Sequence, residues 1–282
     1  MLLSALGAVS GKRRNKWRQK KLAVIGNGYL AGIIADAWEK GFLEGYRFTG
    51  ILGRSREKTE TLAGRAGCRA CFSIEELLEE KPDYVVEAAS VEAVKRFGEA
   101  VLLGGADFLA LSIGAFADEA FYERMKTCAA AQGQRIHILS GAVGGFDVLR
   151  TVALMSAAGE GKLEARMRTK KGPASLQGTP IFKEHLMEDE QESRVFAGSA
   201  KEAIGLLPTK VNVAIAASLA TAGPAHTGME IYSVPGMVGD DHKITAQAGG
   251  VKAVVDIYSS TAAIAAWSAV ERLRNLASPI VF

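Results

Sequence analysis

Short apolar runs alternate with longer amphipathic segments over the first half of the chain. Runs rich in branched residues, typical of strands buried on both faces of a sheet, occupy residues 21–25, 47–52, 84–88, 107–112 and 135–139. Segments with helical spacing follow them at 29–41, 57–66, 73–80, 91–103 and 118–132. This alternation indicates βαβ units, so residues 21–140 are predicted to form an α/β, Rossmann-type doubly wound parallel sheet that binds a dinucleotide.

The pattern changes after Ser140. The segment Gly141-Ala-Val-Gly-Gly145 resembles a hinge, and a helix is expected over 148–157. Alternating stretches at 163–169, 228–233 and 243–248 predict antiparallel strands with one solvated face, separated by helices near 199–207 and 212–222. We therefore expect a second, smaller α+β domain over 141–255 for substrate binding and dimerisation. The end of the chain, 256–282, is expected to rejoin the first domain through a helix at 261–276, leaving a cleft between the two.

Composition and charge narrow the class of protein. The chain has 282 residues, of which 48% are hydrophobic and 23% charged, so a disordered or collagen-like protein is excluded. Six of the 34 Lys and Arg residues lie in residues 1–20, which leaves 28 against 31 Asp and Glu and a net charge of −3 elsewhere. A net negative charge over the rest of the chain does not favour binding to nucleic acid, whose affinity depends on neutralising phosphates. Residues 1–20 are interpreted as a solvated basic extension, with a targeting or RNA-contacting arm as the alternative.

The cysteines and apolar runs predict a soluble, cytoplasmic chain without a membrane span or metal site. Cys68, Cys71 and Cys128 are too few for a disulfide framework and are expected to be reduced. Cys68 and Cys71 lack the further ligands that zinc needs, and are interpreted as incidental thiols in a loop. The chain has no cysteine after residue 140, which disfavours an acylating aldehyde dehydrogenase.

A glycine motif follows the first predicted strand. Gly26-x-Gly28-x-x-Ala31 ends the strand and opens a helix. In dinucleotide-binding folds the first glycine permits a tight turn, the second lets the backbone approach a pyrophosphate, and the third small residue lets the helix pack closely. The motif predicts a dinucleotide with its phosphates at the helix N-terminus.

The end of the second strand indicates which dinucleotide. NAD-preferring domains usually place Asp or Glu there to accept from the ribose 2′-hydroxyl. This chain has Arg54-Ser55-Arg56 instead, and guanidinium groups suit a 2′-phosphate. The cofactor is predicted to be NADP or NAD, with NADP favoured. Two ordinary solvated arginines remain the alternative.

His242 is the candidate catalytic residue among four histidines. It follows Asp240 and Asp241 in a glycine-rich turn that leads into a strand. Neighbouring carboxylates stabilise an imidazolium, so we expect a group poised for acid–base work near neutral pH, with one aspartate orienting the ring. His137 is interpreted as a core or edge residue and His185 as solvated, whereas His226 is ambiguous.

With these residues in view, the chain from about Lys21 onward resembles the L-aspartate dehydrogenase family. The local pieces are Gly26–Gly28, Glu87–Val94, Ser112–Asp118, Ser140–Leu149, Asn212–Ala214, the His242 turn and Leu273–Leu276. The resemblance implies reversible NAD(P)-dependent oxidation of L-aspartate, or a related amino acid, to its imine or 2-oxo acid with release of ammonia, by a homodimer. It implies catalysis by His242 with Asp240, and cofactor contacts from Ala88, Ser90, Ala142 and Asn212. Ser112, Ser140 and Gly141 are the expected substrate-binding residues, through hydroxyl and backbone N–H donors.

Two departures from the family pattern bear on the substrate. Asp240 and Lys210 stand where the family often has asparagine. A carboxylate beside a dicarboxylate substrate would weaken binding unless it is paired, with Lys210 or Lys243 as expected partners. The alternatives are another two-domain NAD(P) oxidoreductase, such as a polyol or sugar dehydrogenase or an imine reductase, and a non-catalytic NADP-sensing protein.

Overall fold

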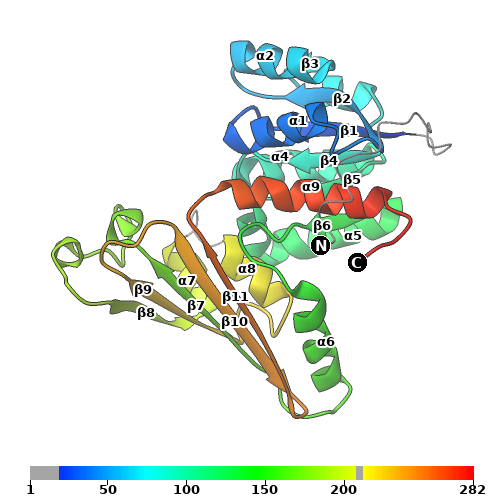
Figure 1. The fold of residues 1–282 in the computed structure, drawn as a ribbon. Helices are drawn as coiled ribbons and strands as arrows, with labels where there is room; N and C mark the ends of the chain where they lie inside the picture. The colour runs from blue at the N-terminus through cyan, green and yellow to red at the C-terminus, as the bar shows by residue number, and fades with distance from the viewer. Residues whose placement is uncertain (1–18, 208–211) are drawn as a thin grey trace, which may run out of the picture.

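The computed structural model describes residues 19–207 and 212–282, which form two β-sheets with helices packed on them (Figure 1). The first sheet has six parallel strands in the order β3-β2-β1-β4-β5-β6. Its strands are β1 (Lys20–Ile25), β2 (Tyr46–Leu52), β3 (Arg69–Cys71), β4 (Tyr84–Glu87), β5 (Asp107–Ala110) and β6 (Ile136–Ile138). The strand order is that of a dinucleotide-binding sheet, and the order reverses between β1 and β4. The predicted parallel α/β fold is confirmed.

Helices cover both faces of the first sheet. They are α1 (Tyr29–Glu39), α2 (Arg56–Ala66), α3 (Ile74–Glu79), α4 (Val91–Leu103) and α5 (Glu119–Gln132), with a 3₁₀ turn η2 (Ile113–Ala117) before α5. Alternate residues of β1 serve the two faces: Leu22 and Val24 pack with α1 and α2, and Ala23 and Ile25 pack toward α4. Burial on both sides explains why this strand is a continuous apolar run.

The second sheet has five strands in the order β11-β10-β7-β9-β8. They are β7 (Glu164–Lys171), β8 (Ser193–Ser199), β9 (Thr227–Ser233), β10 (Asp240–Ala248) and β11 (Val251–Ser259). Among the three predicted strands, the antiparallel expectation is right for β7 and β10 and wrong for β7 and β9, which run parallel. The edge strands β8 and β11, which pair antiparallel with their neighbours, were not predicted. The long connection between β7 and β9, which includes β8 and two helices, lets the chain return in the same direction.

Three helices pack on one face of the second sheet (Figure 1). They are α6 (Phe146–Ala157), α7 (Ala200–Leu206) and α8 (Asn212–Leu219). Residues of α8 also contact η2, so the apolar face of the second sheet joins the core beneath the first sheet. This shared core fixes the position of the second sheet at the end of the first.

The last helix, α9 (Ala263–Ala277), returns to the first sheet and packs on α1 (Figure 1). Its buried face includes Ala266, Val270 and Leu273, and the Tyr46 hydroxyl donates to the Leu273 carbonyl at 2.7 Å. Residues 256–259 belong to β11, so the returning segment begins later than the predicted 256. No helix among the described residues is long and apolar enough to cross a membrane.

Candidate functional site

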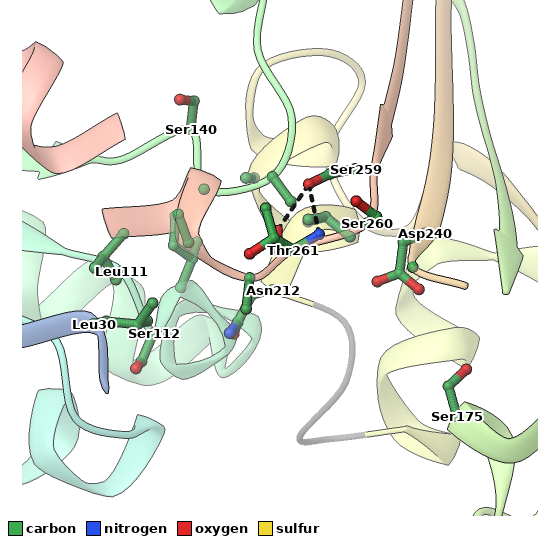
Figure 2. A pocket seen from close by; sticks show the side chains of 18 of the residues that line it. Leu30, Leu111, Ser112, Ser140, Ser175, Asn212, Asp240, Ser259, Ser260 and Thr261 are labelled. Carbon is green, nitrogen blue, oxygen red and sulfur yellow. Dashed lines mark hydrogen bonds between the residues drawn. The ribbon is translucent and has the colours of Figure 1, made fainter. Parts of the chain in front are cut away.

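A cavity of about 540 Å³ lies where the carboxyl ends of β4 and β5 meet the second sheet. Its lining comes from both sheets and from the segments that join them: Leu30, Ala88, Ala89, Leu111–Ile113, Ser140–Ala142, Gly172, Ala174, Ser175, Asn212, Val213, Ala216, Met237–Asp240, Ser259–Ala262 and Ala265. Figure 2 shows Asn212 between Ser112 on one side and Asp240 on the other. Ligands of such sheets bind at the carboxyl edge where the strand order reverses, which is where this cavity lies.

The glycine motif has the shape of a phosphate cradle. Gly26 has φ +132°, and a Cβ there would lie 2.5 Å from the Ala88 carbonyl oxygen, so only glycine fits between β1 and β4. Gly28 caps α1, and a Cβ built on it meets no described atom within 4 Å. Ala31 is buried against the sheet. The open backbone at the N-terminus of α1 fits a dinucleotide pyrophosphate.

The loop after β2 is joined to the glycine motif by Asn27. Its side-chain amide donates to the Ser55 carbonyl at 3.1 Å and to the Thr59 hydroxyl at 2.9 Å. Arg56 bonds Glu60 at 3.2 Å, with its guanidinium 4.1 Å from the centre of the Phe72 ring. Arg54 has no hydrogen-bond or ion-pair partner among the described residues. These residues lie beside the glycine motif and outside the cavity lining.

The residues after β4 and β5 are held by one buried carboxylate, Glu87. It accepts hydrogen bonds from the backbone N–H groups of Ala89, Ser90 and Ser112 and from the Ser112 hydroxyl. Ala88 and Ser112 line the cavity, whereas Ser90 does not and instead caps α4 through its hydroxyl. Because the Ser112 hydroxyl donates to Glu87, it can offer a substrate only its lone pairs.

The hinge segment and α8 form the centre of the cavity wall. Ser140, Gly141 and Ala142 all line it, and Asn212 begins α8 beside them. The Gly141 N–H donates to the Ser268 hydroxyl at 3.1 Å, so this expected donor to a substrate carboxylate is already used. The Asn212 side-chain oxygen accepts from the Gly114 N–H at 2.8 Å, and its NH2 group has no acceptor among the described residues.

His242 is a residue of β10, not of the preceding turn, and only 2% of it is exposed. Its Nδ1 lies 3.0 Å from the Thr169 hydroxyl, and its Nε2 lies 3.9 Å from an Asp240 carboxylate oxygen. Burial and the Lys171 ammonium lower the pKa of His242 to about 4, against the opposing effect of Asp240. The expected imidazolium near neutral pH is therefore wrong. The ring is neutral and lies behind Asp240, which lines the cavity.

Lys171 is the important residue that the sequence patterns missed. Its ammonium lies 2.6 Å from the Asp240 carboxylate, and 14% of its side chain is exposed. The expected partner Lys243 instead bonds Asp256 on the other face of the sheet, and Lys210 lies outside the described residues. Alternation along β7 puts Thr169 and Lys171 on one face, but the contact between Thr169 and His242 joins residues 73 apart in the sequence and has no local signal.

Asp241 does not orient the histidine ring. Side chains of neighbouring strand residues point to opposite faces, so Asp241 faces away from the site and meets Asp256. Burial and the nearby Asp256 carboxylate raise its pKa. Thr169 makes the contact to the ring that an aspartate was expected to make.

Cys68 and Cys71 do not line the cavity. Cys71 is buried in β3, not in a loop, and Cys68 is partly buried just before it. Burial raises the pKa of Cys68 to about 12 and that of Cys71 to about 11, so both are unreactive thiols at neutral pH.

Comparisons with known proteins agree with this geometry. Residues 24–139 match the family model of the homoserine dehydrogenase NAD-binding domain, and residues 153–276 match that of the aspartate dehydrogenase C-terminal region. L-aspartate dehydrogenases of Methanocaldococcus jannaschii and Methanosarcina barkeri are 30% and 31% identical to this chain, over 92% of it and 98% of each relative.

A solved structure shares the fold. The crystal structure of aspartate dehydrogenase from Thermotoga maritima superposes with a TM-score of 0.72 at 24% identity, over 94% of this chain and all of that one. Sequence relatedness along nearly the whole chain, together with this fold, shows that the protein belongs to the L-aspartate dehydrogenase family.

Proposed function

We propose that this protein is an NAD(P)-dependent dehydrogenase that oxidises L-aspartate to iminosuccinate, which water converts to oxaloacetate and ammonia. The observation that carries the proposal is the cavity whose wall joins the carboxyl edge of the dinucleotide-type sheet to Asp240, beside His242 and Lys171. The reverse, reductive amination, uses the same groups.

The first sheet supplies the cofactor site. The N-terminus of α1, with Gly26, Gly28 and Ala31, would hold the pyrophosphate, and Ala88, Ala142 and Asn212 would contact the nicotinamide end. Ser90 supports this wall as the cap of α4. When bound, the cofactor accepts or donates the hydride at the substrate α-carbon. The chain must position the substrate, exclude water and move protons.

His242 is the proposed proton acceptor. Its neutral imidazole lies outside the cavity lining, so a proton released by the substrate amine as the imine forms would reach Nε2 through the Asp240 carboxylate or a bound water, while Thr169 holds Nδ1. The positive charge then formed is stabilised by Asp240, whose carboxylate is 3.9 Å from Nε2. A low pKa keeps the base free of a proton before each turnover.

The charges around Asp240 are compatible with binding of a dicarboxylate substrate. Lys171 neutralises Asp240, so the net charge of the pair does not repel aspartate. The Asn212 amide is the proposed donor to a substrate carboxylate, with Ser140 on the neighbouring wall. Asp240 can in turn accept from the substrate ammonium.

The test of the function is a substrate panel. NADPH and NADH oxidation should be followed with oxaloacetate plus ammonium, then with other 2-oxo acids plus ammonium, and the reverse reaction with L-aspartate, other amino acids and polyols. We expect the highest kcat/KM with oxaloacetate. Higher values with a monocarboxylic 2-oxo acid or with a polyol would assign a different substrate, and binding of nucleotide without turnover would indicate a sensing protein.

The cofactor preference gives a prediction at the loop after β2. Replacing Arg54 and Arg56 together by alanine should weaken NADPH binding by about 10–100-fold and NADH binding by less than about threefold, because charge-assisted hydrogen bonds to a 2′-phosphate are lost. Arg54→Ala alone should account for most of the loss, since Arg56 is already engaged by Glu60 and Phe72. Isothermal calorimetry measures both constants. Arg65→Ala in the same helix is the control, and equal losses for both nucleotides would contradict the assignment.

The outer face of the second sheet supports the proposed homodimer. Within residues 19–207 and 212–282, no α-helix packs on this face, and 60% of Tyr258 and 47% of Val254 are exposed there. This face carries both signs of charge, in the Arg194–Glu230 and Lys243–Asp256 ion pairs, so it can be complementary to a second copy of itself across a two-fold axis. Residues 141–255 are therefore the proposed unit of substrate binding and dimerisation.

Replacing Tyr258 and Val254 by glutamate should convert the dimer to a monomer, because two added charges would be buried at each contact. Sedimentation equilibrium should give twice 29.8 kDa for the unmodified chain and 29.8 kDa for the variant. Leu103→Glu, on an exposed site of α4, should remain dimeric. A monomeric unmodified chain would refute the assembly.

A further inference from the structure

Glu87 is a fully buried acid to which the proposed reaction assigns no task. It ends β4 and is 0% exposed. Oε1 accepts from the Ala89 N–H at 2.7 Å, the Ser90 N–H at 2.8 Å and the Ser112 hydroxyl at 2.9 Å, and Oε2 accepts from the Ser112 N–H at 2.9 Å. Every contact of the carboxylate is with a donor.

This arrangement selects the ionised form of Glu87. Three of the four donors are backbone N–H groups, which cannot turn to accept a proton from a neutral acid. Burial is the largest influence and raises the pKa of the carboxyl above its ordinary value, while each of the four hydrogen bonds lowers it and so favours the ionised form. Among the described residues no cation forms an ion pair with it. From this donor geometry we infer that Glu87 is a carboxylate whose negative charge is stabilised by hydrogen-bond dipoles and not by a cation.

The charge lies next to the cavity. Ala89 and Ser112, which donate to Glu87, both line the wall on the side of the first sheet. Among the described lining residues only Asp240 is ionisable, and Lys171 neutralises it. The wall formed by β4 and β5 is therefore negative, without a cation of the protein to balance it.

We propose that the Glu87 carboxylate is a positioning residue that stabilises the oxidised, cationic nicotinamide ring over the reduced, neutral ring. The proposal rests on the proposed function, which places the nicotinamide end at Ala88, Ala142 and Asn212. A pyridinium carries one positive charge that the dihydropyridine lacks, and a buried anion interacts with that difference through a medium of low dielectric constant. Tighter binding of the oxidised form favours hydride donation by the bound reduced cofactor, which is the amination direction.

If Glu87 had only a structural role, its replacement would have a different effect on binding of the two oxidation states. Glu87 also ties the loop after β4 to the loop after β5, and loosening these loops would weaken the two oxidation states equally. The ratio of the two dissociation constants distinguishes the two roles. A structural loss raises both constants by the same factor and leaves the ratio unchanged, whereas removal of the charge changes the ratio.

The experiment compares Kd for NADP⁺ and NADPH, by calorimetry, in the full-length protein and in Glu87→Gln. We expect the ratio Kd(NADP⁺)/Kd(NADPH) to rise about tenfold in the variant. Glu87→Asp, which keeps the charge, should restore the ratio, and Glu92→Gln, which removes an exposed carboxylate at the same sheet edge, should leave it unchanged. Equal changes in both constants in Glu87→Gln would overturn the proposal.

The unmodified protein provides a test that needs no folded variant. It should bind NADP⁺ at least as tightly as NADPH, and a preference for NADPH of more than about tenfold would overturn the proposal. The same measurements with NAD⁺ and NADH apply if these bind more tightly. Failure to bind any of the four nucleotides would refute the proposed function itself, whereas binding with an unchanged ratio would refute only the role of Glu87.

Discussion

Replacing His242 by alanine is expected to lower kcat by about 10²–10⁴ and to leave NADPH binding nearly unchanged. The loss reflects removal of the group that accepts a proton from the substrate amine. The imidazole lies behind Asp240 and outside the cavity lining, so its removal should not change the dissociation constant for NADPH. Steady-state kinetics in both directions and calorimetry with NADPH measure the two effects. Unchanged turnover would remove His242 from the mechanism.

A buried residue also contributes to stability, so the kinetic loss needs a structural control. Truncation to alanine leaves a cavity that costs about 1–4 kcal/mol of unfolding free energy. His242→Gln fills more of that space and keeps a partner for the Thr169 hydroxyl. A comparable loss of kcat in the glutamine and alanine variants, with a higher melting temperature for glutamine, would assign the effect to proton transfer.

The pH dependence tests the electrostatic setting of the same ring. Because the pKa of His242 is about 4, kcat/KM should not show an inflection near 6.5 that depends on this residue, and its acid limb should lie well below pH 6. Lys171→Met removes a cation that lowers this pKa and leaves Asp240 unpaired, and both changes raise it. The acid limb should therefore move to higher pH. Lys170→Met, on the opposite face and paired with Glu192, should not move it.

The sequence was most informative where a residue is constrained by its neighbours along the chain. Gly26 and Ala31 are required by a local turn and helix contact, and the strands of the first sheet are buried runs, so both the fold and the dinucleotide-type edge were predictable. The edge strand β11 was missed because its exposed alternate positions include Val254 and Tyr258, which obscure the pattern of a strand with one solvated face.

The proposed catalytic cluster could be predicted only in part. His242 and Asp240 are neighbours in sequence, but the ring's environment is set by Thr169 and Lys171, which reach it through strand pairing. Adjacent carboxylates suggested a raised pKa, whereas burial and Lys171 produce the opposite shift. The sign of an electrostatic effect depends on depth and on non-local charges, and neither is visible in a stretch of five residues.

The second large effect is expected at Gly26. Gly26→Ala should destabilise the protein by several kcal/mol and reduce nucleotide binding by more than about 100-fold. Its φ of +132° is rarely adopted by residues with a side chain, and the added Cβ would lie 2.5 Å from the Ala88 carbonyl oxygen. Relief of that contact must separate β1 from β4 at the point where the strand order reverses. Chemical unfolding and calorimetry with NADPH measure the two losses.

The Gly28→Ala variant distinguishes an effect on nucleotide binding from an effect on stability. Its Cβ would meet no described atom within 4 Å and its φ is −97°, so stability should change by less than about 1 kcal/mol. The same Cβ occupies the space through which a pyrophosphate would approach the N-terminus of α1, so nucleotide binding should still fall by at least about tenfold. Gly64→Ala, at an open position within α2, should affect neither property adversely. If Gly28→Ala bound both nucleotides normally, the phosphates would have to lie elsewhere along the sheet edge, and the orientation assigned to the cofactor would be wrong even with the fold intact.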